Sequence, residues 1–149
     1  MTRLSRLLSL PPAERWLVIE AAICLVLAKI LLRLLPFRRI ASILGDTKAS
    51  GETGTAKHQE IAVSIGRAMA QAQRGLPWQS TCLTQALAGR LMLGRRTIPC
   101  TVHIGVGKSD PANQFMAHAW LRVEDVVVTG AFQADRYTPI AAFAHRIQG

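Results

Sequence analysis

Cys82 has the residue type and the setting of a catalytic nucleophile. It follows the polar stretch Gln79-Ser-Thr and opens an apolar run, LTQALAGRLMLG, that suits a helix. At a helix N-terminus the backbone N–H groups point outward and the helix dipole favours negative charge, so both stabilise a thiolate. The same N–H groups can bind a developing oxyanion. Cys82 is therefore a candidate nucleophile, and the alternative is a small apolar residue at the start of a core helix.

His118 is the candidate base for that thiol. It lies in FMAHAWLRV, residues 115–123, whose alternation places Met116, His118, Trp120 and Arg122 on one face of a strand. A histidine held rigidly at mid-strand can reach a thiol on a helix packed beside it. An imidazole that accepts the thiol proton at hydrogen-bond distance completes a cysteine–histidine pair. The alternative is a hydrogen-bonded core histidine, but the two residues together favour catalysis more than either does alone.

The remaining cysteines and histidines do not form a second site. Cys24 lies within an apolar helical stretch and Cys100 shares the inward positions of a strand, so both are predicted to be packing residues. His103 has the opposite strand parity, which indicates a solvent-facing position or a sheet edge. His58 and His145 lie near a linker and the chain terminus. The histidines show no metal-ligand spacing and no phosphate-binding glycine loop is present, so we expect no metal and no cofactor.

The composition limits the class of protein and its partners. A chain of 149 residues, 50% of them hydrophobic, suits one folded domain. Eighteen Lys and Arg residues against nine Asp and Glu give a net charge of +9, which favours an acidic peptide, a membrane surface or nucleic acid. The basic residues are scattered and no aromatic-studded basic stretch accompanies them, so we expect no nucleic acid. Three cysteines without a CxxC indicate a reducing compartment, the cytosol.

The N-terminal segment, residues 1–44, is predicted to be helical and largely apolar. The Pro-Pro-Ala-Glu sequence is a helix-start signal, and the helix is predicted over Pro12–Leu35, with a short helical piece after it. Glu20, Lys29 and Arg33 interrupt the apolar run, whereas a membrane-spanning helix needs around 20 nearly uncharged residues. The helix is therefore expected to pack on the protein or bind a partner, and peripheral contact with a membrane is a further alternative.

The rest of the chain divides into a polar loop and a catalytic core. Residues 45–57 are rich in Gly, Thr and charges and predict a linker or loop, and residues 58–149 form the core of what is one domain overall. A helix at 58–74 is followed by the Cys82 helix, which Gly94 is expected to end. The period then changes to two, which predicts three antiparallel strands and an α+β fold with a helix packed on a small antiparallel sheet. The predicted strands cover residues 97–108, 115–123 and 126–129.

Four stretches resemble the transglutaminase-like cysteine peptidases of lasso-peptide biosynthesis, the leader peptidases related to the microcin-processing protein. They are Cys82-Leu at the head of a helix, the strand Thr101-Val-His-Ile-Gly-Val, the sequence Ala117-His-Ala-Trp, and Leu35-Pro-Phe-Arg-Arg at the end of the N-terminal helix. Their order along the chain is more specific than any one of them. The resemblance covers nearly the whole chain, from about Leu7 to Pro139.

The resemblance implies a papain-like or transglutaminase-like α+β fold with a Cys–His–Asp triad. Cys82 would be the nucleophile and His118 the base. The family usually places the acid on the strand that follows the histidine strand, and here that strand, Val126-Val-Val-Thr-Gly, has none. Asp125 in the preceding turn and Asp135 after the strand are the candidates for the third member. A backbone carbonyl or a polar side chain could also orient the imidazole.

The same resemblance implies the reaction and the partners. A standalone member of this size resembles the split form of the system, in which a separate small protein recognises the leader. The expected activity is a cysteine endopeptidase that removes the leader from a ribosomally made lasso-peptide precursor. The partners are then the precursor peptide, the leader-recognition protein and a macrolactam synthetase. Two alternatives stay open: an acyltransferase of the same fold, and a non-catalytic adaptor tethered to a membrane.

Overall fold

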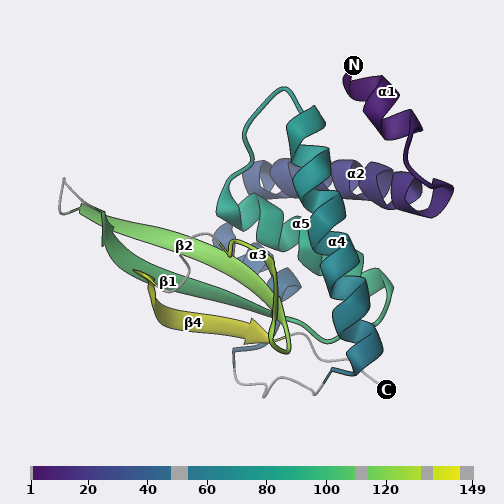
Figure 1. Ribbon diagram of the computed structural model, residues 1–149. Coiled ribbons are helices and arrows are strands. Elements are labelled where there is room, and N and C mark those ends of the chain that lie inside the picture. The colour runs from purple at the N-terminus through teal and green to yellow at the C-terminus, as the bar shows by residue number, and fades with distance from the viewer. Residues whose placement is uncertain (1, 48–53, 110–113, 132–135, 145–149) are drawn as a thin grey trace.

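The fold consists of a group of helices packed on one face of a four-stranded antiparallel sheet (Figure 1). The computed structural model describes residues 2–47, 54–109, 114–131 and 136–144. Within these residues the strand order across the sheet is β3-β2-β1-β4. The helices are α1 (Arg3–Leu8), α2 (Pro12–Leu34), α3 (Phe37–Leu44), α4 (Ala56–Gly75) and α5 (Cys82–Arg95), and the strands are β1 (Thr101–Ser109), β2 (Gln114–Val123), β3 (Val126–Thr129) and β4 (Thr138–Ala144).

The predicted helix-on-meander arrangement is confirmed, and two elements are added to it. Helices α2 to α5 and strands β1 to β3 occur where the apolar periods indicated. Helix α1 lies in the N-terminal segment predicted to be helical but was not predicted as a separate element, and it is capped by the Thr2 side chain, which accepts a hydrogen bond from the Ser5 backbone N–H. Strand β4, also not predicted, pairs antiparallel with β1 on the side away from β2. Because of β4, strand β1 is an inner strand of the sheet.

Helix α5 is the centre of the core. It packs against α2 on one side and against β2 on the other, and its side chains Leu87, Met92 and Leu93 are fully buried. A Cβ atom at Gly89 would lie 2.6 Å from Leu121 Cδ2, so this glycine sets how closely α5 approaches the sheet. The helix that begins with Cys82 is therefore held between α2 and the sheet.

Some predicted boundaries were wrong, for local reasons. Helix α4 begins at Ala56 because Thr55 caps it, with its side chain accepting from the backbone N–H of His58. Helix α5 continues through Gly94 to Arg95. Within the predicted 45–57 loop, Asp46 forms an isolated antiparallel bridge with Ala144, and the two residues exchange two backbone hydrogen bonds. Residues 48–53 of that loop lie outside the described residues.

Helix α2 buries one face in the core and leaves another in solvent. Val18, Ala21, Leu25 and Ala28 are buried at three- and four-residue spacing, and Cys24 is buried beside them, as predicted for a packing residue. Within the described part of the chain, no helix has both the length and the apolar character needed to cross a membrane.

Glu20 fastens α2 to the end of α5. Its carboxylate lies 2.6 Å from Arg96 Nη2 and 3.0 Å from Arg95 Nη1. The hydrogen bond from Arg96 favours the charged form and lowers the pKa of Glu20, although partial burial acts in the opposite direction. A depressed carboxyl pKa contributes stability that is present above the ordinary glutamate pKa and is lost as pH falls through the folded-state value.

Glu20→Gln is expected to lower the free energy of unfolding by about 1–2 kcal/mol at neutral pH, because two arginines lose their carboxylate. Urea denaturation measures this, and the difference from the parent should shrink as pH falls through the acidic range. The control is Glu14→Gln, which alters an exposed glutamate in the first turn of the same helix and should change stability little. An equal effect of both substitutions, or a difference independent of pH, would contradict this account.

Candidate active site

Cys82 is the first residue of α5, as the sequence predicted. Thr81 caps the helix: its Oγ1 accepts a hydrogen bond from the backbone N–H of Thr84 at 3.2 Å. Cys82 is half-buried, whereas the other two cysteines are buried. Burial raises the pKa of the Cys24 thiol, and it raises that of Cys100 to about 11, so both stay protonated at neutral pH. Cys82 is thus the cysteine with the most solvent access.

The loop before Cys82 is held in place by Gln85, which lies in the first turn of α5. Gln85 Nε2 donates to the Ser80 backbone carbonyl at 3.2 Å and to Gln73 Oε1 on α4 at 3.1 Å. On the other side of the loop, Lys29 Nζ of α2 lies 4.2 Å from the centre of the Trp78 ring, a cation–π contact. The residues that lead into the nucleophile are therefore tied to α2, α4 and α5.

His118 stands on the face of β2 that the strand alternation predicted. Its ring stacks on Trp120 at 5.9 Å and on Tyr137 at 4.8 Å between centroids. Leu121 and Val123 alternate with these residues and are buried on the other face, where α5 packs. The imidazole therefore lies on the face of β2 opposite to the one on which α5 packs.

The prediction for His103 was wrong. With β4 present, β1 is an inner strand, and the His103 ring is half-buried and stacks on Trp120 at 5.5 Å. Burial and the nearby Arg122 lower its pKa. Gly105 follows on the same face of β1, where an added Cβ would lie 2.9 Å from the Trp120 ring. The glycine lets Trp120 lie flat against β1, beside His118.

One hydrogen bond fixes the orientation of the His118 ring. Its Nε2 lies 2.7 Å from the backbone carbonyl oxygen of Gly130. A carbonyl oxygen only accepts, so Nε2 carries the hydrogen in this contact. In the neutral imidazole Nδ1 is then the atom with a free lone pair. The ring is thereby set with its basic nitrogen available for a thiol proton.

The group found at Nε2 is a backbone carbonyl, one of the alternatives left open by the sequence. Asp125 lies in the turn between β2 and β3, with a side chain 97% exposed and 4.0 Å from Arg122. Within the described residues it makes no hydrogen bond to His118. Asp135 lies outside the described residues, so a role for it stays a prediction. Gly130 itself gave no signal in the sequence, because any residue type carries a carbonyl.

His118 lies where β3 separates from β2. The described pairing of β2 with β3 runs from Val123–Val126 to Leu121–Thr129 and reaches no further toward His118. Just beyond it, Gly130 adopts a φ of +74°, and a Cβ there would lie 2.5 Å from the Ala119 carbonyl oxygen. The chain therefore turns at this glycine, beside the middle of β2, and presents its carbonyl to the imidazole.

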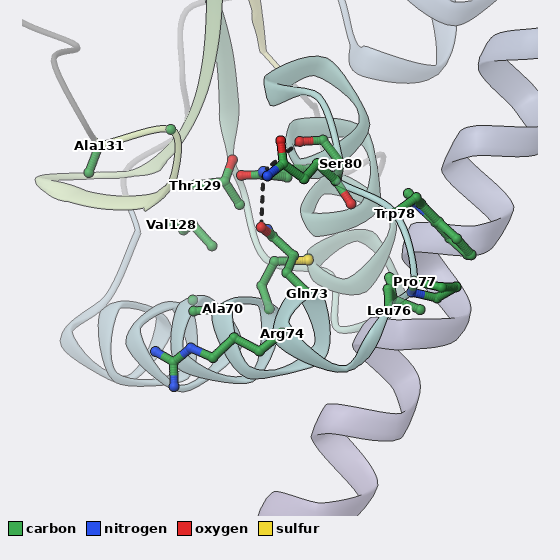
Figure 2. A pocket seen from close by; sticks show the side chains of 15 residues that line it. Ala70, Gln73, Arg74, Leu76, Pro77, Trp78, Ser80, Val128, Thr129 and Ala131 are labelled. Atoms are coloured by element: carbon green, nitrogen blue, oxygen red, sulfur yellow. Dashed lines mark hydrogen bonds between the residues drawn. The ribbon is translucent and has the colours of Figure 1, made fainter. Parts of the chain in front are cut away.

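A cavity of about 690 Å³ lies between this turn and the loop that leads into Cys82. Ser80 and Gln85, on either side of Cys82 in the sequence, line it together with Thr129 and Gly130. Figure 2 shows Ser80, Thr129 and Gln73 gathered around it, with the hydrogen bonds of Gln85 drawn as dashed lines. The start of α5 and the anchor of His118 thus border one hollow, although neither Cys82 nor His118 is among its lining residues.

Three of the residues that line this cavity each have a buried polar atom that makes no hydrogen bond to the part of the chain that the structure describes. These atoms are Trp78 Nε1, Ser80 Oγ and Thr129 Oγ1. Thr129 is only 6% exposed. A buried polar group without a partner is destabilising, so such atoms mark places where a bound molecule can supply the missing bond.

Within the described residues, Cys82 and His118 form no hydrogen bond with each other. The cap of α5 positions Cys82, and the Gly130 carbonyl positions His118. Both supporting groups lie at the border of the same cavity. The described residues also contain no group of three or more His, Cys, Asp or Glu side chains that could hold a metal ion.

Gly130→Ala is expected to displace His118. The new Cβ would meet the Ala119 carbonyl oxygen and the left-handed φ would be strained, at a cost of about 1–3 kcal/mol. Any activity that depends on His118 should fall by up to about a hundredfold in the folded protein, the cost of misplacing a catalytic group by about 1 Å. The control is Gly75→Ala, where an added Cβ meets no atom within 4 Å. If both variants retain parental activity, the Gly130 carbonyl does not position the imidazole.

Comparison with protein-family models identifies the chain. The model described as the transglutaminase-like superfamily matches residues 24–142, which include the C-terminal half of α2, all of α3 to α5 and β1 to β3, and β4 as far as Ala142. Comparisons with curated proteins and with solved structures gave no significant match. The matched region contains both Cys82 and His118, and the observed fold is α+β, as predicted. The chain therefore belongs to the transglutaminase-like superfamily, which includes cysteine proteases and acyltransferases.

Proposed function

We propose that this protein is a cysteine endopeptidase in which Cys82 is the nucleophile and His118 the general base. The observation that carries the proposal is the hydrogen bond from His118 Nε2 to the Gly130 carbonyl, which leaves Nδ1 as the proton acceptor. Family membership supports a thiol-dependent reaction at a carbonyl centre. Cys82, half-buried at the start of α5, is the cysteine suited to it.

The reaction proceeds in two halves. His118 Nδ1 accepts the thiol proton, and Cys82 Sγ attacks the scissile carbonyl carbon to give a tetrahedral intermediate. The C–N bond then breaks and the imidazolium gives its proton to the departing amine, which leaves a thioester on Cys82. Water, deprotonated by His118, attacks the thioester, and the C–S bond breaks to release a free carboxylate and the thiol.

The helix start and the adjoining loop are proposed to bind the oxyanion. The first backbone N–H groups of a helix have no intrahelical partner, and Thr81 uses its side chain for the N–H of Thr84. The N–H groups nearest Cys82 are therefore free for a negatively charged oxygen. The loop 78–81 is the source of any further donor.

The cavity beside Cys82 is proposed to hold the polypeptide next to the scissile bond. Ser80 Oγ and Thr129 Oγ1 can each donate and accept, and Trp78 Nε1 can donate. Met69, Leu76 and Val128 supply apolar surface for the same segment. An extended peptide, with alternating donors and acceptors, satisfies such a mixed wall.

The proposed substrate is the precursor of a ribosomally made lasso peptide, from which the enzyme removes the leader. It rests on the sequence motifs around Cys82 and His118 and on the Leu35-Pro-Phe-Arg-Arg stretch, which resemble the leader peptidases of that pathway. The proposed partners are the precursor, a separate leader-recognition protein and a macrolactam synthetase that acts on the released core. The net charge of +9 would favour acidic peptide or partner surfaces. The proposed location is the cytoplasm.

Incubation of the purified protein with a precursor peptide and a leader-recognition protein tests this proposal. Mass spectrometry should find one cut, with a free carboxylate on the leader fragment. An amide at that position in the presence of added amines would instead identify an acyltransferase, the second activity of this superfamily. Absence of any Cys82-dependent product would favour the non-catalytic adaptor.

A further inference from the structure

The solvent-facing side of α2 carries an apolar stripe that no part of the described structure covers. We define the outer stripe as Trp16, Ile23, Leu27, Ile30 and Leu34, which recur along the helix at a spacing that keeps them on one side. Ile23 is 61% exposed and Leu34 is 74% exposed. Phe37, the first residue of α3, is also exposed. Large apolar side chains aligned in this way mark an interaction surface.

The outer stripe is independent of the packing of α2. The core residues Val18, Ala21 and Leu25 lie on the opposite side of the helix, so the helix is fixed in the domain without the stripe. A shallow depression on the stripe side is lined by Ala22, Ile23, Val26, Leu27 and Ile30, all of them apolar. Protein–protein interfaces usually have a polar rim with about ten hydrogen bonds, and this depression offers no side chain for one.

The N-terminal segment that carries the outer stripe has a net positive charge. Residues 1–44 contain seven Lys and Arg and two Glu. One of the two, Glu20, is already paired with Arg95 and Arg96. Arg33, Arg38 and Arg39 lie at the C-terminal end of the stripe, are exposed, and have no carboxylate within 4.0 Å among the described residues.

We propose that the outer stripe, with Phe37 and the arginines beside it, docks the protein on an anionic lipid bilayer. An amphipathic helix with an apolar face and a basic border lies in the plane of the membrane interface, where its apolar side chains enter the acyl region and its cations meet lipid headgroups. Trp16 and Phe37 stand near the two ends of the stripe, and aromatic side chains favour the headgroup level. The positive border is complementary to anionic lipid headgroups. This complementarity favours docking on an anionic bilayer over docking on an uncharged one. The inference does not depend on the proposed peptidase activity.

Vesicle co-sedimentation tests the proposal with the full chain. The parent protein should sediment with vesicles of phosphatidylcholine mixed with phosphatidylglycerol, and less with phosphatidylcholine alone. Ile23→Gln/Ile30→Gln should weaken binding by at least about tenfold, because two apolar side chains no longer leave water. Arg38→Gln/Arg39→Gln should weaken binding to the anionic vesicles by about tenfold and abolish their advantage over neutral ones.

The control is Val63→Gln/Arg67→Gln, which removes one exposed apolar and one exposed basic side chain from α4, away from the stripe. It should bind as the parent does. The proposal is overturned if the parent ignores anionic vesicles, or if the stripe variants and the control bind equally. The proposal is also overturned if the parent does not bind vesicles while the stripe variants lose binding to a protein partner. That result would identify the stripe as a protein docking site.

Discussion

Cys82→Ala is expected to reduce precursor cleavage by about a thousandfold or more, since the covalent step has no other thiol to use. Cys24 and Cys100 are buried and their pKa values are raised, so neither can substitute. The Cys82 side chain is half-buried at a helix start, and alanine suits that position, so the fold should persist. Circular dichroism checks the fold, and mass spectrometry of the products measures the rate.

Cys24→Ala is the matched control for this experiment. It removes a thiol from the same chain at a buried position of α2, away from the proposed reaction. It should cleave at a rate close to that of the parent. Cleavage by Cys82→Ala at the parental rate would remove Cys82 from the mechanism, and a loss in Cys24→Ala alone would point to packing.

His118→Gln is expected to lower kcat by about a hundredfold to ten-thousandfold, the usual contribution of a general base. The glutamine amide can still donate a hydrogen bond toward the Gly130 carbonyl, which His118 Nε2 contacts at 2.7 Å. It has no basic nitrogen for the thiol proton. The variant thus separates proton transfer from the anchoring of the side chain, and KM should change much less than kcat.

His103→Gln controls for the loss of an imidazole from the same face of the sheet. Both histidines stack on Trp120, at 5.5 and 5.9 Å, so both variants remove one ring from the same stack. Only His118 contacts Gly130 through its ring. Equal losses of activity in the two variants would mean that the stack, and not a base at His118, supports the reaction.

The two candidate residues could be found from the sequence because strong local patterns surround them. The apolar run after Thr81 predicted α5 with Cys82 at its start, and strict alternation in β2 gave His118 its face. Both are confirmed as structural features, while their catalytic roles stay predictions. The partner of His118 could not be found in this way, because a backbone carbonyl at Gly130 depends on where β3 leaves β2 and not on a side chain.

The main error in the predicted fold is the omission of strand β4, because β4 depends on its pairing with the distant strand β1. Strand β4, Thr138-Pro-Ile-Ala-Ala-Phe-Ala, has a weak alternation and a proline, so it does not stand out as a strand. Without it, β1 has one strand neighbour in the predicted sheet, and the parity of His103 indicates a solvent-facing position or a sheet edge. The alternation of His103, Gly105 and Gly107 on one face was a usable signal, since Gly105 and Gly107 leave room for the rings of Trp120 and Tyr137.

The reactivity of the Cys82 thiol tests most directly whether His118 activates it. Iodoacetamide is added to the native protein at neutral pH, and peptide mass spectrometry follows the alkylation of each cysteine over time. An unassisted thiol is only a few per cent thiolate at this pH, so His118→Gln should slow alkylation of Cys82 by about tenfold. Cys24 and Cys100 should stay protected in both proteins. Alkylation of Cys82 at the same rate in parent and His118→Gln would contradict the cysteine–histidine pair.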